Sequence, residues 1–224
     1  MNIDLFKYNT RDNSIRKKLI EDNKRIEKMS KNDYAEFGYD YFDNEKDGIG
    51  YGGYYYDGRF NNIAKDIIKH YDLHPNSKIL EIGCAKGFLL YEFYIHGMDI
   101  EGIDKSEYAV NNCISEIKHK ISIYDVEKGL PYPDNAFDLI IAKESLPHIN
   151  NDKLAFVIKE IIRCSKNKIF FEIQIANSLK EKEYMKLWDI THKSIYTENE
   201  WINIFNNCNY QGDYHFKILI NENL

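Results

Sequence analysis

The chain has 224 residues, with 30 Lys and Arg against 36 Asp and Glu, which gives a net charge of −6 at pH 7. This length suits a domain with its own core, and 43% hydrophobic with 29% charged residues excludes a disordered or fibrous protein. The acidic balance argues against a general nucleic-acid binder, and the lack of long apolar runs argues against a membrane span or signal peptide.

Residues 1–32 are predicted to form a polar helical segment. Ile15, Leu19, Ile26 and Met29 recur at roughly helical spacing. Basic residues surround them, namely Arg16, Lys17, Lys18, Lys24, Arg25 and Lys28. We expect a solvent-exposed helix that packs weakly on the body, rather than a basic interaction patch.

The segment 33–59 has an unusual composition. Seven of the 18 tyrosines lie between Tyr34 and Tyr56, together with Gly48, Gly50, Gly52, Gly53 and Gly58. This mixture predicts a turn-rich loop with aromatic anchors. We therefore expect residues 1–59 to form an N-terminal cap and residues 60–224 to form the main domain.

From residue 60 onward, helices and strands are predicted in alternation. Strands are expected at 78–82, 99–103, 120–124, 137–142, 168–173 and 214–220, and helices between them, with Ser106 and Thr197 as caps. Nearly continuous apolar strands separated by helices predict an α/β fold with a doubly wound, mostly parallel sheet, flanked by helices on both faces. In such sheets ligands bind beyond the carboxyl ends of the strands, so the loops after residues 82, 103, 124 and 142 should surround one crevice.

The loop after the first strand carries the main motif, Glu81-Ile82-Gly83-Cys84-Ala85-Lys86-Gly87. Its small residues follow the spacing i, i+2, i+4, whereas a nicotinamide-dinucleotide fold expects glycines at i, i+2 and i+5. Glycine lets a ligand approach the backbone closely. Asp104 ends the next strand 21 residues after Gly83, a distance at which an acid can accept hydrogen bonds from ribose hydroxyls.

These segments resemble the class I methyltransferases that use S-adenosyl-L-methionine (SAM). The match to their motif I is K-I-L-E-I-G-C-A-K-G-F, and it continues through G-I-D-K-S, Y-D-V-E-K-G-L-P-Y-P-D-N-A-F-D-L-I-I-A and the segment to Pro147-His148-Ile149, over roughly residues 60–220. The chain departs at Ala85, where a middle glycine is usual. It also departs at its end, where one strand is predicted instead of two antiparallel strands. The resemblance implies SAM as the cofactor and S-adenosyl-L-homocysteine (SAH) as its product.

The resemblance also implies a set of cofactor contacts. Asp104 would take the ribose hydroxyls, and Asp125 would accept from the adenine amino group beside the Val126 backbone. Gly83 and Ala85 would allow approach to the methionine part. Glu81 would brace the loop or reach the ligand through water, while Lys105 or Ile103 would flank the adenine. Further predicted contacts are Cys84, Gly87, Lys143, Tyr54 and Arg59, although Arg59 fits a structural salt bridge equally well.

Methyl transfer is a direct displacement. Alignment of the reacting atoms lowers the barrier by up to ~7–11 kcal/mol. A general base raises the rate roughly 100- to 10,000-fold. We predict His148, after the fourth strand, as the base; packing against the next helix is the alternative. Glu144, on the same loop, and His192, in the insertion 174–196, are the other candidates. Glu172 and Gln174 should face the same crevice. We find no metal-ligand spacing and expect no metal.

The sequence points to a small acceptor. Lys143-Glu144-Ser145-Leu146 stands where methyltransferases of DNA or amide nitrogen carry an Asn-Pro-Pro-Tyr type loop. The stretch 50–60 resembles small bacterial methyltransferases of surface-polysaccharide pathways. This suggests O-methylation of a sugar, nucleotide-sugar or capsule precursor, including a phosphoramidate decoration. Two alternatives stay open, a non-catalytic SAM-binding partner protein and a nicotinamide-dependent oxidoreductase. The oligomeric state is not predicted.

Two compositional features complete the picture. Widely spaced Cys84, Cys113, Cys164 and Cys208 form no Cys-x-x-Cys pair, which predicts free thiols in a reducing cytoplasm. The tyrosine cluster precedes the first strand and can fold over the crevice as a lid or simply anchor the loop. We expect that some of the four tyrosines of this stretch line the pocket and the others are anchors, namely Tyr51, Tyr54, Tyr55 and Tyr56.

Overall fold

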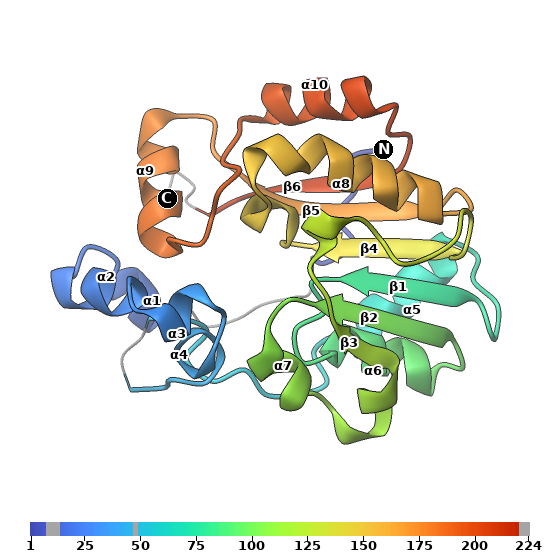
Figure 1. The fold of residues 1–224 in the computed structure, drawn as a ribbon, viewed down its shortest axis with the longest axis horizontal. Coiled ribbons are helices and arrows are strands. Elements are labelled where there is room, and N and C mark those ends of the chain that lie inside the picture. The colour runs from blue at the N-terminus through green and yellow to red at the C-terminus, as the bar shows by residue number, and fades with distance from the viewer. Residues whose placement is uncertain (8–13, 47–48, 220–224) are drawn as a thin grey trace.

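A six-stranded sheet forms the centre of the computed structural model, which describes residues 1–7, 14–46 and 49–219 (Figure 1). Every pairing between its strands is parallel, in the order β3-β2-β1-β4-β5-β6. The strands are β1 (Lys78–Ile82), β2 (Asp99–Asp104), β3 (Ile121–Ile123), β4 (Leu139–Lys143), β5 (Ile169–Ile175) and β6 (Asp213–Ile218). This confirms the predicted doubly wound α/β fold.

Helices cover both faces of the sheet, which explains the apolar strands. The helices α8 (Asn151–Cys164) and α10 (Glu198–Cys208) bury their apolar sides on one face, and α5 (Asn61–His70) and α6 (Phe88–Ile95) on the other. All seven residues of β5, an interior strand between β4 and β6, are buried. Short helical turns join the remaining elements, namely α7 (Glu107–Asn111), η1 (Ser115–Lys120), η2 (Val126–Lys128) and η3 (Leu146–His148).

The helix starts follow the predicted caps. Ser106 accepts a hydrogen bond from the Ala109 amide at the start of α7, and Thr197 forms a capping box with Glu200 at the start of α10. The sequence did not predict α9 (Leu179–Trp188), which lies in the 174–196 insertion and begins with a capping box of its own at Ser178.

The far edge of the sheet differs from the usual family ending. In the described residues the chain closes with the single strand β6, parallel to β5, and the predicted strand end at residue 220 lies outside them. The first residues run along this edge, since Asn2 bridges to Tyr214 and the Ile3 amide donates to the Tyr214 carbonyl at 2.8 Å. Phe6 then packs on Phe170 in the core, with a ring separation of 5.7 Å.

The helical part of the N-terminal cap lies at the carboxyl ends of the strands, beside α9 (Figure 1). It contains α1 (Ser14–Lys18), α2 (Asn23–Met29), α3 (Asn32–Ala35) and α4 (Tyr39–Phe42). The Ile15 side chain and Gly48, both named in the sequence analysis, lie outside the described parts. The division at residue 59 stays a prediction.

The prediction of a weakly packed, solvent-exposed helix in residues 1–32 is wrong. Arg16 and Arg25 are only 8% and 3% exposed, and both donate to the Trp188 carbonyl at the end of α9. The last carbonyls of a helix lack partners within it, so two guanidinium groups satisfy them and favour the negative end of the helix dipole. Arg16 and Arg25 therefore join the cap to the insertion.

Within the described ranges, no helix combines the length and the apolar character that crossing a bilayer requires.

Candidate functional site

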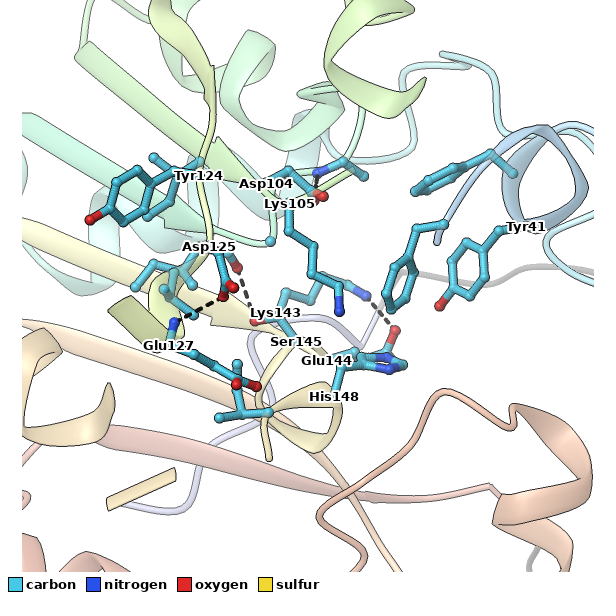
Figure 2. Close-up of a pocket in the computed structure, with 18 of the residues that line it drawn as sticks. Tyr41, Asp104, Lys105, Tyr124, Asp125, Glu127, Lys143, Glu144, Ser145 and His148 are labelled. Carbon is cyan, nitrogen blue, oxygen red and sulfur yellow. Dashed lines mark hydrogen bonds and ion pairs between the residues drawn. The ribbon is translucent and has the colours of Figure 1, made fainter. Parts of the chain in front are cut away.

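The loops at the carboxyl ends of β1 to β4 surround a first cavity of about 730 Å³, open solvent at its mouth included. Such a volume suits a small-molecule site. Asp104 and Asp125 reach it from the ends of β2 and β3, and Glu144 and His148 from the segment after β4 (Figure 2). Eight of the predicted cofactor contacts line this cavity, namely Gly83, Ala85, Ile103, Asp104, Lys105, Asp125, Val126 and Lys143.

The loop after β1 presents its backbone to this cavity. Gly83 has a φ of +72°, and a Cβ added there would lie 2.5 Å from the Cβ of Ser145. Ala85 has a φ of +49°, in the left-handed region that costs a residue with a side chain about 1–2 kcal/mol. The resemblance to motif I predicts glycine at this middle position, and this conformation gives the physical reason.

Asp104 is held rigidly at the edge of the cavity. One of its carboxylate oxygens accepts from the Ala85 amide and the other from the Ser106 amide, each at 2.8 Å. Burial raises the pKa of Asp104, and these two amides partly oppose that rise. A carboxylate fixed in this way keeps lone pairs that can accept hydrogen bonds from the hydroxyls of a ligand.

Tyr124, Asp125 and Lys105 line another part of the cavity. Asp125 caps η2 through the Glu127 amide at 3.0 Å, and Tyr124 lies beside it. The Lys105 ammonium lies 4.3 Å from the ring centre of Phe37, a residue of the cap. Burial, helped by Lys193, lowers the pKa of Lys105.

Three predicted cofactor contacts line neither this cavity nor the second cavity described below. Glu81 is buried under the loop, and burial, opposed by Lys143, raises its pKa to about 8. Cys84 is also buried. Gly87 begins α6 with a φ of +75°, where a Cβ would lie 2.5 Å from Ile121. These positions support the loop from behind, and their contact with a ligand stays a prediction.

A second cavity of about 1400 Å³, open solvent included, adjoins the first. Five residues line both, namely Tyr41, Tyr51, Lys143, Glu144 and His148. The predicted residues Tyr54, Tyr55, Arg59, Gln174 and His192 line the second cavity but not the first. The cap and the α9 insertion thus enclose a space next to the first cavity.

The tyrosine-rich stretch divides as the sequence suggested. Tyr51 lines both cavities, and Tyr54 and Tyr55 line the second. Tyr56 is an anchor, because its hydroxyl donates to Glu92 at 2.6 Å. Arg59 forms a local salt bridge, with its Nε 2.9 Å from both carboxylate oxygens of Asp57.

Glu144 is tightly paired. Its carboxylate lies 2.8 Å from the Lys143 ammonium and 2.7 Å from that of Lys217. Burial alone would raise the pKa of Glu144, but the two cations outweigh it and hold that pKa well below its ordinary value. Glu172 also pairs with Lys143, at 3.2 Å. A carboxylate so stabilised as an anion is a weak proton acceptor.

His148 is the better placed base. Its Nδ1 lies 2.9 Å from the Thr191 hydroxyl, which donates to Asp189 at 2.7 Å. The other oxygen of Asp189 accepts from the Tyr41 hydroxyl at 2.9 Å. Because the Thr191 proton is already used, Nδ1 of His148 carries the donated hydrogen and Nε2 keeps a free lone pair. Burial first, and then His192, lower the pKa of His148 to about 4, so the ring is neutral near pH 7.

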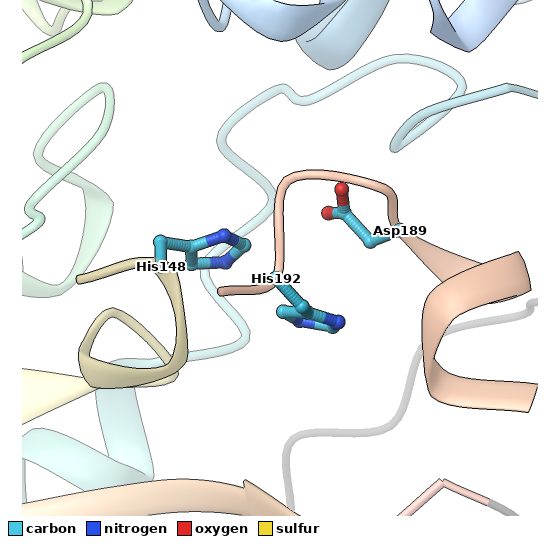
Figure 3. Close-up of side chains that lie close together, drawn as sticks. All are labelled: His148, Asp189 and His192. Atoms are coloured by element: carbon cyan, nitrogen blue, oxygen red, sulfur yellow. The ribbon is translucent and has the colours of Figure 1, made fainter. Parts of the chain in front are cut away.

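His148, Asp189 and His192 lie close together (Figure 3); all three line the second cavity, and His148 also lines the first. The histidine rings lie 4.7 Å apart at 30°, and one potential ligand atom of each residue falls within 4.8 Å of the others. Both Asp189 oxygens already accept hydrogen bonds, one from Thr191 and the other from Tyr41. We therefore interpret these contacts as a hydrogen-bond relay that runs from Asp189 through Thr191 to His148. The sequence missed Asp189, Thr191 and Tyr41, because the relay crosses the insertion and the cap.

A family model described as a methyltransferase domain matches residues 73–210, more than half of the chain. The chain belongs to this methyltransferase domain family. SAM is the cofactor of its class I fold, and the Gly83 loop in the lining, the held carboxylate of Asp104 and the volume of the first cavity all fit it.

Curated relatives agree with this assignment, and a solved structure shares the fold. Phosphoethanolamine N-methyltransferase 3 of Arabidopsis thaliana is 30% identical over 101 residues, 42% of this chain and 20% of that protein. A ubiquinone biosynthesis O-methyltransferase of Pelagibacter ubique is 29% identical over 147 residues, 58% and 60% of the two chains. The structure of a SAM-dependent methyltransferase from Archaeoglobus fulgidus matches with a TM-score of 0.54 and 20% identity, over 66% of this chain and 68% of that one. The chain thus covers between a fifth and three fifths of the length of these curated relatives.

Proposed function

We propose that this methyltransferase domain transfers the methyl group of SAM to an oxygen atom of a small-molecule acceptor. The observation that carries the proposal is the junction of the two cavities. The first fits SAM, the second is open for an acceptor, and His148 lines both. The imidazole at that junction is neutral near pH 7 and keeps the lone pair of Nε2, which can accept the proton of a hydroxyl group.

The residues divide the work between binding and proton transfer. Asp104 and Asp125 would hold the ribose and the adenine, and the backbone at Gly83 and Ala85 would leave room for the methionine part. SAM supplies an activated methyl group when bound. The chain aligns the acceptor oxygen with it and accepts the hydroxyl proton at Nε2 of His148, while Thr191 and Asp189 keep the ring oriented.

The choice of oxygen rests on the base. A hydroxyl group must lose its proton as it attacks, and a base accepts that proton. Methylation of DNA or amide nitrogen is disfavoured, because Lys143-Glu144-Ser145 stands where the loop for such acceptors is expected. The relatives named above include both an N- and an O-methyltransferase. A sugar, nucleotide-sugar or capsule precursor, including a phosphoramidate, stays a prediction that rests on the resemblance of residues 50–60. A cytoplasmic location and the lack of nucleic-acid and membrane partners also stay predictions.

Two other functions remain for comparison. A non-catalytic SAM-binding partner protein would keep the first cavity and need no base. A nicotinamide-dependent oxidoreductase is disfavoured by the i, i+2, i+4 spacing of the motif and by the family match.

Ligand binding separates these functions first. We expect SAH and SAM, but not NAD, to raise the melting temperature of the protein. Lack of stabilisation by either adenosyl ligand would contradict the proposal. Mass spectrometry should then detect an acceptor one methylene heavier after incubation of sugar nucleotides or capsule precursors with enzyme and SAM. The product should disappear in His148→Ala, and its persistence there would remove His148 as the base.

A further inference from the structure

His192 is a polar residue of the second cavity that the proposed proton transfer does not use. It lines this cavity and not the first, and its ring lies 4.7 Å from the ring of His148, at an angle of 30° (Figure 3). His148 ends the turn after β4, and His192 belongs to the segment after α9. Two segments far apart in the sequence therefore place two imidazole rings side by side in the wall of one cavity.

The hydrogen-bond partner of His192 fixes its tautomer. Its Nδ1 lies 3.2 Å from the backbone carbonyl of Met185, and a carbonyl oxygen only accepts, so Nδ1 carries the hydrogen. Burial lowers the pKa of His192 and outweighs Asp189, which raises it, so the ring is neutral near pH 7. Nε2 of His192 therefore keeps a lone pair, as Nε2 of His148 does.

These two lone pairs need donors. Neither Nε2 carries a hydrogen, so neither atom can donate to the other, and within the described ranges no residue donates to either of them. Polar atoms enclosed by protein are nearly always hydrogen-bonded to protein, to water or to a ligand. The two rings thus form a subsite for a molecule that brings two donors.

The charge of the second cavity favours a neutral donor. Five basic residues line it against the carboxylates of Glu144 and Asp189, namely Arg16, Lys17, Arg59, Lys143 and Lys217. A positive excess remains when Glu172 and Asp57, which pair with two of these cations, are also counted. This excess repels an ammonium group, whereas a hydroxyl group donates a hydrogen bond without carrying a charge.

We propose that His192 is an acceptor-binding residue, and that the pair of His148 and His192 selects a diol with its two hydroxyl groups on neighbouring carbons. The inference rests on the proposed function, since it names the class of acceptor for the same site. The two hydroxyls must be neighbours because the rings that receive them are neighbours, with centres 4.7 Å apart.

Each ring has its own part in the transfer. The hydroxyl at His148 takes the methyl group as the bond from that group to sulfur breaks, and its proton moves to Nε2 of His148. The hydroxyl at His192 keeps its proton and donates a hydrogen bond to Nε2, which holds the acceptor in place. A monomethyl ether and SAH are left, with the proton on His148.

The test compares three probes that share one ring skeleton. The SAH complex is titrated with the vicinal diol of cyclohexane, with cyclohexanol and with cyclohexylamine, and NMR of nitrogen-labelled histidine follows Nε2 of both rings. His192→Phe keeps an aromatic ring beside His148 but removes the lone pair, and His192→Gln offers a carbonyl oxygen instead. His119→Phe, at an exposed position, is the control with the same substitution. Metal analysis accompanies the titrations, because a metal ion bound by His148, Asp189 and His192 would use the same lone pairs.

We expect the diol to bind the wild-type SAH complex roughly 3- to 10-fold more tightly than cyclohexanol, the gain of one hydrogen bond, and to shift both Nε2 signals. His192→Phe should abolish this preference, His192→Gln should keep part of it, and His119→Phe should match the wild type. Equal affinities for the diol and cyclohexanol, an unchanged preference in His192→Phe, tighter binding of cyclohexylamine or a stoichiometric metal ion would each overturn the inference. SAH affinity separates the two proposals: normal SAH binding without a preference for the diol rejects only the subsite, whereas lack of SAH binding in the wild type rejects the function itself.

Discussion

The Thr191 hydroxyl stands between His148 and Asp189, 2.9 Å from Nδ1 of the ring and 2.7 Å from the carboxylate. Thr191 and Asp189 belong to the segment after α9, whereas His148 ends the turn after β4. The hydroxyl proton goes to the carboxylate, so the ring must donate from Nδ1 and present the lone pair of Nε2. The insertion thus sets the tautomer of the proposed base.

Replacement of Thr191 tests this positioning role. Thr191→Val keeps the shape of the side chain but removes the acceptor for Nδ1, so kcat should fall roughly 10- to 100-fold, within the range of general-base effects. The KM for SAM should stay unchanged, because Thr191 does not line the first cavity. Thr191→Ser should restore most of the rate. Equal rates for the Val and Ser variants would show that the hydroxyl does not act through His148.

The lowered pKa of His148 predicts that the folded protein is less stable at acidic pH. Burial and His192 lower its pKa to about 4 in the folded protein, whereas an ordinary histidine in the unfolded chain titrates near 6.5. Between these values the unfolded chain binds more protons, so the free energy of unfolding should fall as the pH drops from about 6.5 to about 4. Urea unfolding at pH 7 and pH 5 should show a smaller loss in His148→Asn. The exposed His119→Asn is the control, and an equal loss in both variants would exclude the buried histidine as the cause.

The sequence predicted the sheet because its signals are local. Apolar strands, the Ser106 cap and the Thr197 capping box each need only a few neighbouring residues, and the resulting strand ends bring Asp104 and Asp125 to one cavity. The relay could not be predicted in this way. Asp189 meets Tyr41 across 148 residues, and Arg16 meets Trp188 across 172. Arg16 and Arg25 were predicted to be exposed like the other basic residues of this segment, yet their partners are carbonyl groups of a helix that the sequence did not reveal.

Asp104 should decide cofactor affinity. Asp104→Ala removes a carboxylate that two backbone amides hold at the cavity edge, and a hydrogen bond to a charged group is worth about 1.5–3 kcal/mol. The Kd for SAH should therefore rise roughly 10- to 100-fold by calorimetry. Asp99→Ala, at the start of the same strand, should leave it unchanged, because Asp99 pairs with Lys120 instead. An unaltered Kd in Asp104→Ala would remove this residue from the cofactor site.

Arg25 should be essential for the stability of the cap. Its guanidinium donates to the carbonyls of Leu187, Trp188 and Ile49 at 2.6, 2.9 and 3.2 Å. Arg25→Met leaves these buried carbonyls without that donor, so the free energy of unfolding should fall by about 2–3 kcal/mol. Lys24→Met, at an exposed position on the same helix, should change it little. Similar unfolding curves for the two variants would mean that the cap does not depend on this contact.

Ala85 offers the opposite prediction, a change that stabilises the protein. Its φ of +49° is costly for alanine, by about 1–2 kcal/mol, whereas glycine adopts it freely but loses more entropy on folding. Ala85→Gly should therefore raise the free energy of unfolding by about 0.5–1 kcal/mol and keep SAH binding. Ala155→Gly, on the exposed side of α8, should lower it by about 1 kcal/mol, because there the backbone is helical. If both variants were destabilised alike, the left-handed conformation of the motif I loop would not be the conformation in solution.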